Sequence, residues 1–207
     1  MAVVVSTLGL SPAIVTEFIE ELRKRKVDVE EVFLAATRTS VVSAYALQLY
    51  FRLKGWNVKV KPRTLKVEDI RRPEDCRAFR VEMLKVLKDA VKRAGGADNV
   101  YVSLAGGRKT MPIDMFLAAM ARGVRNVYHV VAPGVLGTQN ILNVLSEEEL
   151  KQVERAARDP RVRVSEEVAG KVEELCRPEK DVNLVRVPIP RLPDEEVKGL
   201  EKDLRRT

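Results

Sequence analysis

Runs of apolar residues alternate along the first part of the chain with segments whose apolar positions recur at helical spacing. The run from Ala2 to Thr7 is continuous and rich in β-branched side chains, which is typical of a strand buried on both faces. Strands are predicted at residues 2–7, 30–37, 57–62, 99–107 and 126–133, and helices at 11–26, 40–55, 73–96 and 112–123. This alternation predicts a doubly wound, mostly parallel Rossmann-like α/β sheet of about six strands with helices on both faces.

Beyond Pro133 the periodicity weakens. The elements expected there are a loop or short hairpin at 134–145, helices at 146–159 and 165–176, and a sixth strand at 182–190. The prolines of that last strand favour an edge position in the sheet. We therefore expect one domain over residues 1–192, followed by a polar helical tail over residues 193–207.

Small and polar residues gather at three junctions where a predicted strand gives way to a helix. The junctions contain Thr7, Gly9 and Ser11; Thr37, Arg38, Thr39 and Ser40; and Gly106, Gly107, Arg108, Lys109 and Thr110. Because the carboxyl ends of parallel strands share one edge of a sheet, these residues are expected to lie together. Helix N-terminal N–H groups, hydroxyls and cations in one place are suited to binding an anion.

Neither glycine loop matches a known nucleotide-binding fingerprint. GLSPAI lacks the spacing of G-x-G-x-x-G, and AGGRKT lacks that of a Walker A loop, so nicotinamide binding and ATP hydrolysis are poorly supported. Simpler interpretations stay open for each junction alone: Ser11 as a plain helix cap, and GGRKT as a tight turn with two solvated cations.

The charged composition fits an anionic partner without demanding one. Lys and Arg outnumber Asp and Glu by 37 to 30, which is compatible with a phosphate-bearing ligand but also with a solvated surface. Charged residues make up 32% of the chain, which favours a thermophilic origin. The N-terminal apolar run is short and lacks a basic leader, and no stretch approaches the length of a membrane helix, so we expect a cytoplasmic protein.

The residues that usually carry metal or nucleophilic chemistry are sparse. Cys76 and Cys176 are far apart in the sequence, and the lone histidine, His129, lies within a predicted strand. No cluster of Asp, Glu and His follows the strands, so we expect no metal and no cofactor. Any chemistry would then depend on positioning and electrostatic stabilisation.

Two segments in order along the chain resemble a known family. TLGLSPAIVTEFI (7–19) and SLAGGRKTM (103–111) are similar to two signatures of CRISPR-associated Rossmann fold (CARF) proteins, and VNLVRVPIPRL (182–192) is similar to their closing strand. Many members carry an effector domain such as a HEPN ribonuclease. We expect none in this chain, because the lone histidine that an R-x4-6-H signature would need, His129, lies within a predicted strand.

The resemblance implies a homodimer that binds a cyclic oligoadenylate, with cyclic tetra-adenylate favoured, as in type III CRISPR immunity. The ligand-binding residues it implies are Thr7, Gly9, Leu10, Thr37, Arg38, Thr39, Ser40, Ala105, Gly106, Gly107, Arg108 and Thr110. Candidates for the dimer interface lie in the helices after the first and fourth strands: Ile14, Phe18, Met115 and Leu117.

A CARF protein without an effector domain resembles the stand-alone ring nucleases, which cleave the cyclic oligoadenylate. By motif, their catalytic serine falls on Ser11 and their catalytic lysine on Lys109. The implied chemistry is metal-independent attack of a ribose 2′-hydroxyl on the adjacent phosphodiester. Two alternatives stay open: a non-cleaving CARF sensor that acts through a partner protein or DNA, and an unrelated α/β protein with a phosphoryl ligand.

Overall fold

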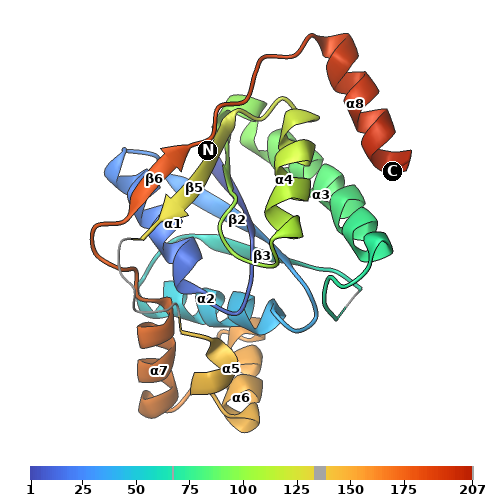
Figure 1. Ribbon diagram of the computed structural model, residues 1–207. Coiled ribbons are helices and arrows are strands. Elements are labelled where there is room, and N and C mark those ends of the chain that lie inside the picture. The colour runs from blue at the N-terminus through green and yellow to red at the C-terminus, as the bar shows by residue number, and fades with distance from the viewer. Residues whose placement is uncertain (67, 133–138, 207) are drawn as a thin grey trace.

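A computed structural model describes residues 1–66, 68–132 and 139–206, and these contain one six-stranded sheet (Figure 1). The strands are β1 (Ala2–Thr7), β2 (Val29–Ala36), β3 (Lys59–Thr64), β4 (Val100–Ser103), β5 (Asn126–Val131) and β6 (Asn183–Arg186). Their order is β3-β2-β1-β4-β5-β6; all pair in parallel except β6, which runs antiparallel to β5 at the edge. The predicted Rossmann-like fold is confirmed.

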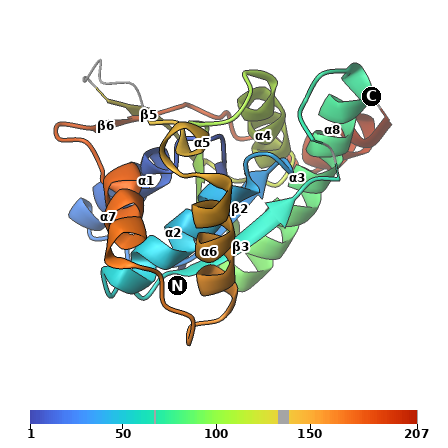
Figure 2. The ribbon, with the colours of Figure 1, turned by 90° about the horizontal axis from the view of Figure 1, so that it is seen from below.

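Helices cover both faces of this sheet. They are α1 (Ala13–Lys24), α2 (Val41–Leu53), α3 (Pro73–Ala94), α4 (Thr110–Met120), α5 (Ile141–Val144), α6 (Glu147–Arg158), α7 (Glu166–Cys176) and α8 (Asp194–Arg206), with a 3-10 turn, η1 (Ala97–Asn99). Figure 2 shows α1 and α2 on one side of the sheet and α3 and α4 on the other. The winding therefore changes face between β1 and β4, which makes their carboxyl ends the switch point of the fold. Within the described ranges, no helix is long and apolar enough to cross a membrane.

Two hydrophobic cores, one on each face, account for the packing. Phe18 of α1 is fully buried with the α1–α2 core and lies 6.0 Å from the ring of Tyr128 in β5. Met115 of α4 is fully buried in the core on the opposite face. The expectation that these two side chains form a dimer interface is wrong, because the chain's own packing already covers them.

Helices α5 to α7 form a separate group, and α6 and α7 pack against α2 (Figure 1). A capping box begins α6: the Ser146 hydroxyl accepts from the backbone N–H of Glu149, whose carboxylate accepts from the N–H of Ser146. Lys171 of α7 also donates to Glu149, and these contacts lower the pKa of Glu149 to about 2.

The predicted loop or hairpin at 134–145 is wrong at residues 141–144, which form α5. The Asn140 side chain caps this single turn by accepting from the backbone N–H of Leu142. The backbone N–H of Ile141 donates to the carbonyl of Leu10 at 2.9 Å, which anchors the turn to the first junction. Residues 134–138 lie outside the described residues.

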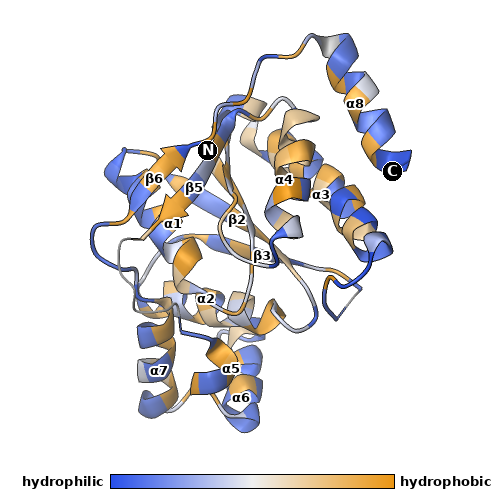
Figure 3. Cartoon of the chain, viewed as in Figure 1, coloured by the Kyte–Doolittle hydropathy of each residue, from blue (hydrophilic) through white to orange (hydrophobic). Residues whose placement is uncertain are grey.

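The C-terminal helix α8 is docked on α3 and α4, although Figure 3 shows it as largely hydrophilic. Leu204 is buried in the core of that face. Arg122, after α4, donates from both terminal nitrogens to the Glu201 carboxylate at 2.7 and 2.9 Å. The division into a domain at 1–192 and a tail at 193–207 stays a prediction.

We predict that Leu204→Ala loosens α8 without unfolding the sheet. Truncating a buried leucine at the edge of a core costs about 2 kcal/mol, the low end for such changes, which corresponds to an equilibrium constant for local opening about 30-fold larger. Hydrogen exchange should be faster for α8 amides and unchanged for β1. The exposed Lys202→Ala is the matched control, and unchanged α8 exchange in Leu204→Ala would contradict the docking.

Candidate functional site

The first and third junctions contact each other through their glycines at the switch point. A Cβ added to Gly9 would lie 2.9 Å from the backbone nitrogen of Gly107, and one added to Gly106 would lie 3.0 Å from the carbonyl oxygen of Thr7. Gly106 and Gly107 also have left-handed backbone conformations, with φ of +96° and +78°. These glycines therefore allow the loop after β1 and the loop after β4 to lie directly against each other.

A buried hydroxyl strengthens this contact. Thr7 is fully buried at the end of β1, and its hydroxyl donates to the carbonyls of Ala105 and Gly106 at 3.1 and 2.9 Å. Thr7 and Ala105 were expected to bind ligand. In the structure both are buried and hold the two loops together.

The second junction is shaped by two buried side chains. The Thr37 backbone N–H donates to the Ser40 hydroxyl at 3.0 Å, and the two hydroxyls lie 3.3 Å apart. The Thr37 carbonyl accepts from the N–H of Val41, which begins α2. Ser40 and Thr37 therefore fix the turn between β2 and α2, whereas Arg38 and Thr39 between them are exposed.

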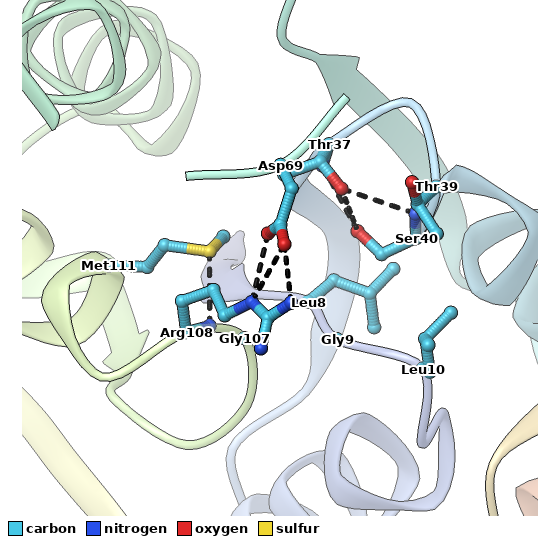
Figure 4. A pocket seen from close by; sticks show the side chains of 10 residues that line it. All are labelled: Leu8, Gly9, Leu10, Thr37, Thr39, Ser40, Asp69, Gly107, Arg108 and Met111. Carbon is cyan, nitrogen blue, oxygen red and sulfur yellow. Dashed lines mark hydrogen bonds and ion pairs between the residues drawn. The ribbon is translucent and has the colours of Figure 1, made fainter. Parts of the chain in front are cut away.

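These junctions surround a cavity of about 210 Å³ at the carboxyl edge of the sheet (Figure 4). Seven predicted residues line it: Gly9, Leu10, Thr37, Thr39, Ser40, Gly107 and Arg108. The other predicted residues are outside the lining: Thr7, Ser11, Arg38, Ala105, Gly106, Lys109 and Thr110. Three further residues line the cavity and were not predicted: Leu8, Asp69 and Met111.

Asp69 was missed because it belongs to a fourth junction, between β3 and α3. The predicted third strand ended at Pro62, whereas β3 continues to Thr64 and ends at the same edge as β1, β2 and β4. The signal available in the sequence was the acidic pair Glu68–Asp69 shortly after that strand.

Asp69 forms an ion pair with Arg108, and both side chains line the cavity (Figure 4). Nε of Arg108 donates to the two carboxylate oxygens at 2.9 and 3.1 Å, and Nη2 also donates to Asp69. The guanidinium holds the pKa of Asp69 below its ordinary value, and the carboxylate raises the pKa of Arg108. Arg108, which was predicted to face a ligand, is therefore held by the Asp69 carboxylate.

The two candidate catalytic residues lie just beyond the contact between the loops. Ser11 and Lys109 each follow, by two residues, one of the contacting glycines Gly9 and Gly107. Ser11 is partly buried and precedes the cap position of α1, which falls on Pro12. Lys109 is exposed at the cap position of α4, where helix N–H groups also favour an anion.

A second cavity, of about 750 Å³, lies beneath α8 and is lined by Gly123, Arg191 and Glu201 among others. It is larger, but it lies away from the strand ends that bind ligands in doubly wound sheets. Among the described residues, no group of three or more His, Cys, Asp and Glu side chains is arranged to hold a metal ion. His129 is exposed on β5.

The fold defines a Rossmann-like α/β protein with a cavity at its switch point. The family model for CRISPR-associated protein NE0113 (Cas_NE0113) matches residues 11–206, and the chain belongs to this family. The resemblance to CRISPR-associated Rossmann fold proteins is thereby confirmed.

Two known proteins are informative comparisons. The chain is 30% identical over 137 residues to the CRISPR system ring nuclease SSO2081 of Saccharolobus solfataricus, which is 63% of this chain and 72% of that protein. It is similar in fold to Enterococcus italicus Csm6 bound to cyclic hexa-2′-fluoro-hexa-dAMP, with a TM-score of 0.54, 10% identity and 98% of this chain covered. The chain spans 44% of that Csm6 chain.

We predict that Gly9→Ala destabilises the protein. The added methyl would press on the Gly107 backbone, and overpacking of this kind costs about 1–3 kcal/mol. Chemical denaturation measures the change. Gly170→Ala is the matched control, because its Cβ meets nothing within 4 Å in α7 and alanine is favoured in a helix by about 1 kcal/mol. Equal stability of the two variants would contradict the close loop contact.

Proposed function

We propose that the protein is a ring nuclease that binds a cyclic oligoadenylate, with cyclic tetra-adenylate favoured, and cleaves it without a metal ion. The observation that carries the proposal is the contact of Gly9 with Gly107, because it brings the loops of Ser11 and Lys109 together at the ligand-binding edge. The 30% identity to a ring nuclease supports it.

The proposed reaction uses a nucleophile from the substrate. The oxygen of a ribose 2′-hydroxyl forms a bond to the adjacent phosphorus, the bond from phosphorus to the 5′-oxygen breaks, and the 2′-hydroxyl proton ends on that leaving oxygen. The product is linear, with a 2′,3′-cyclic phosphate and a 5′-hydroxyl. Lys109 stabilises the charge that builds on the phosphorane, and Ser11 positions the 2′-hydroxyl or a phosphate oxygen.

A binding-only sensor is the second candidate. The residues that line the cavity include Arg108 and the second junction, but neither Ser11 nor Lys109. Such an arrangement suits holding a phosphate better than cleaving it. Turnover of labelled cyclic oligoadenylate in excess EDTA separates the two functions.

We predict that Lys109→Ala loses most cleavage and keeps binding. A cation that contacts the scissile phosphate more closely in the transition state raises rate rather than affinity, and its removal costs about 10²–10³ in rate. Single-turnover cleavage of cyclic tetra-adenylate should fall by that factor, while the Kd stays within about tenfold.

Lys92→Ala, at an exposed position in the last turn of α3, is the control and should cleave as the wild type does. EDTA should change neither protein. Wild-type cleavage by Lys109→Ala would exclude this role, and the binding-only function would then be preferred.

A homodimer would complete the site. The cavity of one chain, about 210 Å³, is smaller than the roughly 300–1,000 Å³ of small-molecule sites, and a ring with rotational symmetry calls for a symmetric site.

An apolar surface is available on β5 and β6, where Val131 and Val185 are 41% and 52% exposed, and Ile113 of α4 is 61% exposed. Figure 1 shows the two strands in front of α1, and no helix of the described residues covers their near face. We propose this face, rather than the buried Phe18 and Met115, as the dimer interface.

We predict that Val185→Glu makes the protein monomeric, because a charge buried in an interface without a partner is strongly unfavourable. Sedimentation at micromolar concentration should show a dimer for the wild type and a monomer for the variant. Leu53→Glu, at a position 42% exposed on α2, is the control and should stay dimeric. A monomeric wild type would contradict the proposed dimer.

A further inference from the structure

The two arginines of the candidate site are both paired with neighbouring residues of one junction. Arg38, from the second junction, donates to Glu68 at 3.2 Å, and Arg108, from the third, forms the fork-like pair with Asp69. The Thr39 hydroxyl also donates to the carbonyl of Glu68 at 3.0 Å. Two adjacent carboxylates of the β3–α3 junction therefore lie beside the cations expected to meet phosphate.

The Asp69–Arg108 pair is held in place. The Asp69 side chain is only 15% exposed, and its carboxylate also accepts from the backbone N–H of Ile70 at 2.9 Å. Separating the pair would leave a mostly buried carboxylate without its strongest partner, which is costly. By contrast, the side chains of Arg38 and Glu68 are 58% and 69% exposed, and an ion pair of that kind contributes little and exchanges readily.

The geometry of the fork leaves part of Arg108 available. A guanidinium has five N–H donors, and Asp69 engages Nε and Nη2 along one edge. Both N–H groups of Nη1 and the second one of Nη2 are not used by this contact. Arg108 can therefore keep Asp69 on one edge and present the other edge to an anionic oxygen.

We propose that Asp69 is a positioning residue: it fixes the guanidinium of Arg108 beside the cavity so that its free edge receives a phosphate of the ligand. This inference rests on the proposed function for the identity of that ligand. Glu68 has no such role, because its pair with Arg38 is exposed at both ends.

A carboxylate beside an anion site has two opposite effects on the affinity for a phosphate. A substitution that removes the carboxylate therefore shows which effect is larger. Its charge repels a phosphate, so removing the charge alone would tighten binding. Its hold on Arg108 saves the cost of immobilising a long side chain when the ligand binds, so removing the hold would weaken binding. Asp69→Asn and Glu68→Gln each remove one negative charge from adjacent positions, which makes them a matched pair.

Isothermal titration of the wild type and both variants with cyclic tetra-adenylate tests the inference. Asp69→Asn should raise the Kd about three- to tenfold, the cost of ordering one long side chain, whereas Glu68→Gln should stay within about twofold. In an Arg108→Ala background, Asp69→Asn should no longer weaken binding, because Asp69 acts through Arg108 and only the relief of charge repulsion is left, which favours binding. Unchanged or tighter binding by Asp69→Asn would overturn the inference, as would an equal loss in the Arg108→Ala background.

A second measurement separates this inference from the proposed function. If the wild type binds no cyclic oligoadenylate, the proposed function fails, but the Arg108 Nε–H signal in nuclear magnetic resonance still reports on the pair without ligand. That proton should be protected from exchange in the wild type and in Glu68→Gln, and lose protection in Asp69→Asn. Equal protection in all three proteins would overturn the positioning role.

Discussion

The close contact between the ends of β1 and β4 is the constraint on which the rest of the site depends. Gly9 can lie against the backbone of Gly107 only because Gly9 carries no Cβ, and the Thr7 hydroxyl holds the same two loops together. The switch in winding direction lies between these strands, so both faces of the sheet supply helices that begin here. A larger residue at this contact would separate the elements that surround the cavity.

The electrostatics of the site follow from this geometry. Three junctions supply hydroxyls, helix N-termini and cations, and the fourth supplies the acidic neighbours Glu68 and Asp69. The Arg108–Asp69 pair is less exposed than the Arg38–Glu68 pair, and this difference decides how firmly each arginine is held. The mostly buried Asp69 orients Arg108 at the cavity, whereas the exposed Arg38 stays free to exchange partners.

Much of this arrangement could be predicted before the structure. Hydrophobic periodicity located the strands and the long helices, and the positions of small and polar residues after strands pointed to the edge of the sheet where the cavity lies. The prediction failed where local pattern is weak. The turn at residues 141–144 is stabilised by a hydrogen bond from Ile141 to Leu10, a contact distant in sequence. Phe18 and Met115 were proposed for an interface because periodicity identifies an apolar face but not what covers it.

By itself, the sequence determined the alternation of strands and helices, the glycine-rich junctions and the family, because these depend on residues near one another along the chain. Only the tertiary structure decided which polar side chains line the cavity and which hold the loops together. Thr7 faces the neighbouring loop and Asp69 reaches Arg108, 39 residues away. Such roles depend on distances between separate strand ends, and no local pattern encodes those distances.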